Sequence, residues 1–242
     1  MSRFDFFGTR STALHFLCCV AAVFSITACV SAPLHAGVLL TYPFSNSGDG
    51  QNGFAPSAFD SSVLASQAVT KGPGLNQFAV AVEGTLGMQV LKTGPSTSVA
   101  NATAADALSL DWYFSINLTP QSTMDISSIE MDWSRGGTTG TRGWFVRSSQ
   151  DNYATDLYSN ETLNGTAVGL QHVSISLSGF SGIGATDFRV YIYSGTTGRY
   201  MDFQNVQFNG LSAAAVPEPS TLAILGLGSL GVAYRARRKA KA

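Results

Sequence analysis

The chain has 242 residues, only 12% of them charged, and a formal net charge of −1. Residues 37–215 contain seven basic and thirteen acidic residues, which gives this part a formal charge of −6 and leaves the other basic residues at the two ends. A body of that sign repels phosphate backbones, so nucleic acid is excluded as an expected partner. The low charge content, with many Gly, Ser and Thr residues, is atypical of a helical cytosolic enzyme.

The first 36 residues predict a signal peptide that signal peptidase removes. Arg3 and Arg10 precede an apolar run, and small residues lead to a cleavage point after Ala36, which is the order of a secretory signal. A second interpretation is a lipoprotein signal, because Ile-Thr-Ala-Cys at 26–29 resembles a loose lipoprotein box in which Cys29 is lipidated and retained. A retained membrane helix is a third interpretation. The apolar run argues against it, because it lacks long hydrophobic continuity.

All three cysteines lie inside this predicted signal, at Cys18, Cys19 and Cys29. Cleavage after Ala36 therefore leaves a mature chain without a thiol, which excludes disulfides, thiol catalysis and cysteine metal sites. Of the three histidines, only His172 remains. A histidine zinc site is thus not expected, and a Ser-His-Asp triad would depend on this single residue.

Residues 37–212 predict one domain built from half-buried strands. Apolar and polar residues alternate, and clusters of Gly, Asn, Asp and Ser separate the alternating stretches. The expected strands are 37–44, 77–82, 86–91, 110–118, 129–133, 143–148, 173–177, 188–193 and 200–208. One short helix is expected at 156–163. Many strands with one polar face and no long helices between them predict an all-β fold, an antiparallel jelly-roll β-sandwich of the lectin or carbohydrate-binding kind.

Three tyrosines and one arginine suggest carbohydrate binding. Tyr191 and Tyr193 share a strand face with Arg189, and Tyr113 occupies the equivalent face of another strand. Aromatic rings beside hydrogen-bonding groups are suited to sugar rings. The preferred alternative is cross-strand aromatic pairing, which needs no ligand.

Two carboxylates two residues apart, Glu130 and Asp132, are the candidate pair for glycoside hydrolysis. They resemble the Glu-x-Asp-x-x-Glu strand motif of laminarinase-like jelly-roll glycosidases, although Arg135 stands where that motif has its third acid. A polar, solvated strand face explains the same two residues and is the preferred interpretation.

Calcium is the one candidate cofactor, because loop carboxylates and carbonyls bind it in many sugar-binding sandwiches. Asp202 and Asn205 near the last strand are the candidate ligands, and the loop around Asp49 is another. No EF-hand spacing is present.

Residues 213–242 predict a linker and a membrane-directed tail. Pro217-Glu218-Pro219 is followed by a Gly-rich apolar helix over 222–234 and a basic end over 235–241. The apolar segment is shorter than the ~20 residues of a comfortable span. The basic residues that should stay cytoplasmic are Arg235, Arg237, Arg238 and Lys239. The Pro-x-Pro sequence stiffens the linker and stops the helix from running back into the domain.

This tail resembles the PEP-CTERM sorting signal in its three-part order, from the Pro-Glu-Pro tripeptide to the terminal arginines. The resemblance implies that Pro217, Glu218 and Pro219 are recognised by an exosortase, which processes the tail while it is transiently inserted in the inner membrane. It further implies export to the surface or extracellular matrix of a Gram-negative bacterium that makes exopolysaccharide. The body is similar to ectodomains that accompany such tails, at 39–44, 146–151, 188–193 and 199–206, and these carry no assigned activity.

Three functions stay open at this point. The preferred one is a non-enzymatic surface or biofilm-matrix protein, with signal peptidase, exosortase and exopolysaccharide as partners. The second is a secreted glycan-active hydrolase that uses Glu130 and Asp132. The third is a purely structural coat or adhesion component with no small ligand.

Overall fold

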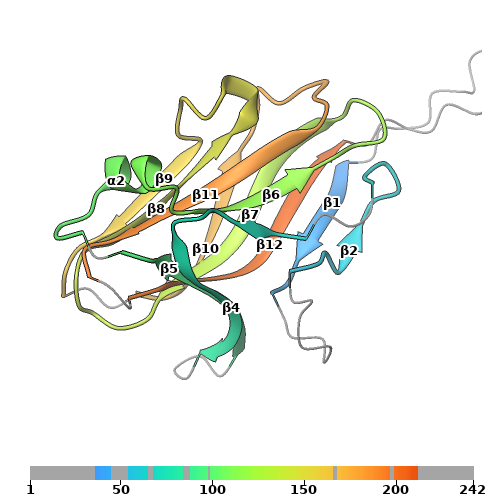
Figure 1. Cartoon of the computed structure of the whole chain (residues 1–242). Coiled ribbons are helices and arrows are strands. Elements are labelled where there is room, and N and C mark those ends of the chain that lie inside the picture. Colours follow the sequence, from blue (N-terminus) through green and yellow to red (C-terminus); the bar gives the residue numbers. More distant parts are fainter. Residues whose placement is uncertain are drawn as a thin grey trace, which may run out of the picture. The chain divides into compact units, whose positions relative to one another are not determined.

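Two antiparallel sheets make up the described part of the chain (Figure 1). The structure is a computed structural model that describes residues 36–44, 54–64, 68–83, 88–97, 99–165, 168–196 and 199–211. Its strands are β1 (Ala36–Tyr42), β2 (Ala58–Phe59), β3 (Thr70–Lys71), β4 (Leu75–Glu83), β5 (Met88–Pro95), β6 (Tyr113–Leu118), β7 (Asp125–Arg135), β8 (Arg142–Ser148), β9 (Tyr158–Thr162), β10 (Val168–Ser176), β11 (Thr186–Ser194) and β12 (Met201–Leu211). The helical elements are α2 (Ala104–Ser109) and the 3-10 turn η1 (Ser149–Asp151).

The larger sheet has seven strands in the order β10-β7-β12-β1-β2, with β5 also beside β12 and β4 beside β5. The smaller sheet has five strands in the order β3-β6-β11-β8-β9. Successive strands from β6 onwards mostly alternate between the two sheets, and each pairing between named strands is antiparallel. The predicted all-β antiparallel sandwich is therefore confirmed.

Alternating residues of the facing strands fill the space between the sheets. Phe114 of β6 and Trp144 of β8 both contact Phe203 of β12, with ring centroids 5.4 Å apart in each pair. At another point Phe188 of β11 lies 5.1 Å from Phe208 of β12. Each of these rings is at most 1% exposed, and burying one such side chain stabilises the fold by about 1.5–3 kcal/mol. This aromatic core fixes which face of each sheet points outwards.

The prediction of a short helix at 156–163 is wrong, because this segment forms strand β9. Tyr158 and Thr162 pair with Val146 and Arg142 of β8. The segment is polar and has no clear period of its own, so pairing with the neighbouring strand decides its conformation.

Helix α2 has no counterpart among the expected elements, and it displaces the start of the next strand. The backbone N–H of Thr103 donates to Asp106 Oδ2 at 2.8 Å, which closes the first turn of the helix. Asp111 then adopts a left-handed conformation with φ 53°. The strand expected from residue 110 therefore begins only at Tyr113, and Trp112 is fully buried beneath the helix end.

The described residues include no helix with the length and apolar character that a bilayer crossing requires. The signal peptide before Ala36 and the apolar helix expected at 222–234 lie outside the described residues. The boundaries predicted for the signal peptide, the β-domain and the sorting tail stay predictions. The first and last described strands, β1 and β12, are hydrogen-bonded neighbours.

Candidate functional site

The outer face of the five-stranded sheet carries the four residues predicted for carbohydrate binding. In the strand register, Tyr191 of β11 lies opposite Tyr113 of β6 on one side and Phe145 of β8 on the other. The Tyr113 and Tyr191 rings are 5.2 Å apart, and Phe145 stacks on Tyr191 at 4.9 Å with an interplanar angle of 4°. A row of aromatic rings therefore crosses three neighbouring strands.

Two of the four predicted residues are covered by other parts of the protein. Tyr191 is 3% exposed and Tyr193 is 6% exposed, and helix α2 packs against β11 and β8. The Tyr193 hydroxyl donates a hydrogen bond of 2.8 Å to Glu161 Oε2. Neither ring can lie flat under a sugar, so the expectation that these two tyrosines form an open platform needs correction. Tyr113 and Arg189 are half-buried and reach the surface.

Arg189 lies between two tyrosine rings. Its guanidinium carbon is 4.3 Å from the ring centroid of Tyr113 and 3.9 Å from that of Tyr153, within the range of a cation–π contact. Its Nε is 3.2 Å from Asp187 Oδ2. Burial alone would lower the pKa of Arg189, but a hydrogen bond with Tyr191 and the nearby tyrosines together raise it above its ordinary value. The cation is therefore permanent and fixed in position.

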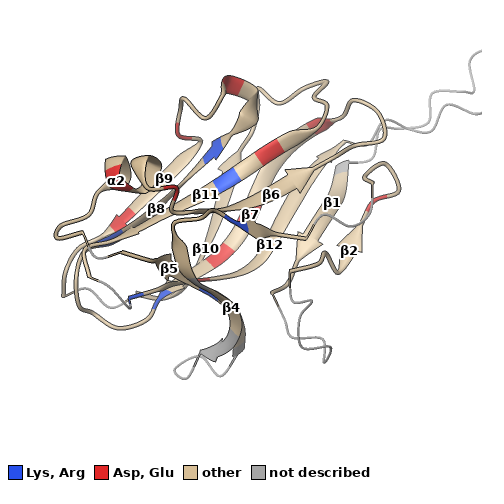
Figure 2. Cartoon of the chain, viewed as in Figure 1, with Lys and Arg blue, Asp and Glu red and all other residues tan. Residues whose placement is uncertain are grey.

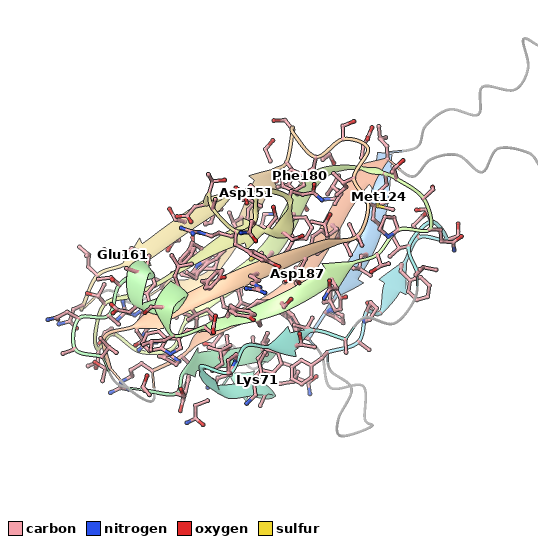
Figure 3. All side chains as sticks on the ribbon, turned by 45° about the horizontal axis from the view of Figure 1, so that its top comes forward. Lys71, Met124, Asp151, Glu161, Phe180 and Asp187 are labelled. Atoms are coloured by element: carbon pink, nitrogen blue, oxygen red, sulfur yellow. The ribbon has the colours of Figure 1, made fainter. Side chains whose placement is uncertain are left out.

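Asp187 connects the groups around Arg189. It accepts hydrogen bonds from Tyr153 Oη at 2.7 Å and from Ser115 Oγ, and its backbone N–H donates to Ser149 Oγ at 3.0 Å. Figure 3 shows Asp187 between Asp151 on one side and Lys71 on the other. We call Tyr113, Ser115, Tyr153, Asp187 and Arg189 the Arg189 cluster.

Burial is the main reason that the pKa of Tyr153 is raised to about 12, and the hydrogen bond to Asp187 and its negative charge add to this. Tyr153 thus stays neutral at ordinary pH and donates a hydrogen bond to the carboxylate.

An unusual backbone places Tyr153 in the cluster. The turn η1 ends with Asn152 at φ 57° and Tyr153 at φ 60°, both left-handed. The N–H of Asn152 donates to Ser149 O at 3.2 Å, and that of Tyr153 donates to Ser148 O at 2.8 Å, as in a Schellman motif. A left-handed tyrosine costs about 1–2 kcal/mol. Arg147 offsets part of this strain, because its Nη1 donates to Tyr153 O at 2.8 Å.

The sequence did not predict Tyr153 as a site residue, because its position depends on contacts that no local pattern encodes. Asn152 tolerates the left-handed conformation and is a weak signal for a turn. The left-handed tyrosine after it has no sequence signal.

The carboxylate pair Glu130 and Asp132 lies on β7, in the other sheet, on a half-buried outer face. Asp132 Oδ1 is 2.8 Å from His172 Nδ1 of β10, and Asp132 Oδ2 accepts a hydrogen bond of 2.8 Å from Asn205 Nδ2 of β12. Both oxygens of Asp132 are thus occupied by neighbouring strands. This arrangement is that of a polar strand face.

The two predicted calcium ligands do not share a site. Asn205 is exposed and donates its amide to Asp132, whereas Asp202 is 1% exposed and close to the buried guanidinium of Arg142. Burial chiefly, then the charges of Arg135 and Arg199, lower the pKa of Arg142 to about 10, against an opposite effect of Asp202. Across the described ranges, no three His, Cys, Asp or Glu side chains come together as a metal site would require.

The predicted processing residues lie at or beyond the ends of the described part. Ala36 opens strand β1. The tripeptide Pro217, Glu218 and Pro219 lies outside the described residues, and so do Arg235, Arg237, Arg238 and Lys239.

A comparison with protein families decides what the tail is. Residues 215–239 match the family described as the PEP-CTERM protein-sorting motif. The chain carries a PEP-CTERM sorting signal. This signal marks an exported protein that an exosortase sorts. No curated protein matches the chain in sequence.

Three solved structures match the chain at low identity and with TM-scores below 0.5. The CBM22-1 xylan-binding domain of Paenibacillus barcinonensis Xyn10C is 12% identical, with a TM-score of 0.42 over 76% of this chain and 100% of that one. A family 35 carbohydrate-binding module from an environmental isolate is 12% identical, with a TM-score of 0.34 over 62% and 100%. TmCBM61 in complex with β-1,4-galactotriose is 11% identical, with a TM-score of 0.33 over 58% and 85%.

Proposed function

We propose that this PEP-CTERM protein is a non-enzymatic component of the cell surface or extracellular matrix that binds exopolysaccharide through the Arg189 cluster. The observation that carries the location is the sorting motif, which follows an all-β domain by only a few residues. Before its removal by exosortase, the apolar segment at 222–234 holds the domain at the inner membrane. The released domain then meets the polysaccharide outside.

The chemistry of the Arg189 cluster supports a ligand rich in hydroxyl groups. The side chain of Arg189 keeps 26% of its surface exposed, and a guanidinium presents several N–H donors in a fixed plane. Asn117, exposed on the same strand face, lies opposite Asp187 in the register and adds an amide. Because the cluster is held by hydrogen bonds within the protein, a ligand would meet groups that are already ordered.

The balance of charge on this face favours a neutral glycan over a strongly anionic one. Arg189 is paired with Asp187, and Arg147 is paired with Asp156 at 2.5 Å. Figure 2 shows both signs of charge on β11. Neither arginine is thus an unpaired cation that would attract a polyanion, and recognition depends on directional hydrogen bonds and on the half-buried ring of Tyr113.

Binding of the released protein to exopolysaccharide tests this proposal. Arg189→Lys keeps the charge but loses the planar fork, so at least tenfold weaker binding is expected. Asn117→Ala removes an exposed amide without disturbing the core and should weaken binding about threefold. Gln171→Ala, an exposed amide on β10 of the other sheet, is the matched control and should bind as the parent does.

Two other outcomes would replace the proposal. A parent protein that binds none of the polysaccharide its cells produce would indicate a purely structural coat or adhesion component. Hydrolysis of that polysaccharide by the parent, lost in Glu130→Gln, would indicate the secreted hydrolase that uses Glu130 and Asp132.

A further inference from the structure

Three strand ends meet at one end of the sandwich. In the register of β1 and β12, Ala36 lies opposite Leu211, and on the other side of β12 Leu211 lies opposite Asp125, where β7 begins. β1 begins and β12 ends at this end, and Met124 and Phe180 lie there too (Figures 1 and 3). The predicted signal cleavage site and the start of the sorting tail therefore share one end of the domain.

This end of the domain carries a hollow of about 200 Å³. The hollow is lined by Asp125, Ile126, Ser127, Leu177, Ser178, Phe180, Ser181 and Leu211. We call these residues the tail-end surface. Asp125 Oδ1 accepts hydrogen bonds from Ser181 Oγ at 2.8 Å and Gly182 N at 2.7 Å. Because Ile126 N also donates to Phe180 O at 2.8 Å, the turn that forms one side of the hollow is tied to β7.

The sorting tripeptide is tethered very close to this surface. Pro217 follows Leu211, the last residue of β12, by six positions. Six fully extended residues span at most about 20 Å. A small protein domain is about 30 Å across. An enzyme that holds the tripeptide in its active site therefore lies within about 20 Å of the end of the sandwich.

We propose that the tail-end surface is the docking surface for the exosortase while it cleaves the tail. This inference rests on the proposed sorting function and adds the contact that sorting requires. The chemistry of the surface supports close approach. Residues 119–127, 177–185 and 206–211 contain no Lys or Arg, and their one acid, Asp125, is already hydrogen-bonded. Small serines and glycines can meet a protein surface without burying an unpaired charge.

Site-specific photo-cross-linking tests the contact in cells that contain the exosortase and the full chain. A photo-reactive residue at Ser178, which is exposed on the tail-end surface, is expected to cross-link to the enzyme. The control position is Thr138, exposed in the loop after β7 and therefore at the opposite end of that strand. It is expected to give no cross-link.

Tail cleavage provides a second measurement on the same position. Ser178→Trp should slow cleavage at least tenfold, because a large ring keeps the enzyme away from a tripeptide on a short tether. Thr138→Trp should be cleaved as fast as the parent. A flexible spacer of about 15 Gly and Ser residues after Leu211 should restore the rate of Ser178→Trp, since it adds reach without changing the surface.

The possible failures are distinguishable. If the parent is cleaved but Ser178 cross-links no better than Thr138, and Ser178→Trp is cleaved at the parental rate, the docking surface is refuted and sorting stands. If cells that contain the exosortase leave the parent uncut, the sorting function itself is refuted.

Discussion

Tyr153 Oη donates a hydrogen bond of 2.7 Å to Asp187 Oδ2, across 34 positions of sequence. This bond joins the segment after β8 to the start of β11. Asp187 in turn holds Arg189, so the tyrosine in a strained turn fixes the orientation of the only guanidinium in the Arg189 cluster. The position of the proposed ligand site thus depends on a turn that lies outside the strands of the sheet.

Tyr153→Phe should destabilise the protein by about 1.5–3 kcal/mol, because it removes a hydrogen bond to a charged acceptor that is largely shielded from water. Urea unfolding of parent and variant measures the difference. Tyr158→Phe is the matched control, since no hydroxyl hydrogen bond is found for Tyr158 within the described residues, and it should change stability by less than about 0.5 kcal/mol. Equal losses in the two variants would contradict the role given to Tyr153.

The same hydrogen bond predicts a pH dependence at the alkaline end. The pKa of Tyr153 is 10.0 in an ordinary setting and about 12 in the folded protein. Its contribution is fully present below pH 10, where both states keep the proton. It is lost as the pH rises from 10 to 12, because only the unfolded chain then releases the proton.

Comparison of the parent with Tyr153→Phe isolates this effect from other tyrosines. The difference in unfolding free energy between the two proteins should shrink between pH 10 and 12. A difference that stays constant over that range would show that Tyr153 ionises equally in both states.

Arg142→Met should cost about 3–5 kcal/mol, since it takes a cation from a fully buried site beside Asp202. It also removes the donor to Tyr200 O at 2.6 Å, which ties the loop before β12 to β8. Lys71→Met removes an exposed cation and should cost less than about 1 kcal/mol. Thermal unfolding of both variants measures the contrast, and similar melting temperatures would argue against a buried anchoring role for Arg142.

Gly210→Ala should destabilise the end of the sandwich near the tail. A Cβ at this position would overlap the carbonyl oxygen of Asp125 on β7, so the strands would have to separate at a cost of about 1–3 kcal/mol. Gly169→Ala on β10 is the control, because a Cβ there meets nothing within 4 Å. Urea unfolding should give Gly210→Ala a clearly lower free energy of unfolding than the parent, and Gly169→Ala a value close to that of the parent. The reverse order would contradict the register of β7 and β12.

The sheet faces could be predicted from the sequence, but not what covers them. Strict alternation over 129–133 and 188–193 places each side chain on the inner or outer face, because the side-chain period of a strand is two residues. Alternation says nothing about a helix packed on the outer face. Tyr191 and Tyr193 therefore seemed available to a ligand, but in the folded protein they are only 3% and 6% exposed.

The sorting tail is the part that could be predicted most completely, because its signal is local. A membrane-directed signal is recognised as a linear order of residue types, and residues 215–239 carry that order in one stretch. The Arg189 cluster is the opposite case. Its members come from β6, β11 and the segment after β8, and only the fold brings them together.

Mass spectrometry of the intact protein recovered from the outside of its native cells tests the central claim, export followed by removal of the tail. A chain that begins at Gly37 and ends close to Pro217-Glu218-Pro219, without the basic residues from Arg235 onwards, is the predicted result. A chain of all 242 residues, present in the cytosol and absent from the cell surface, would contradict the account.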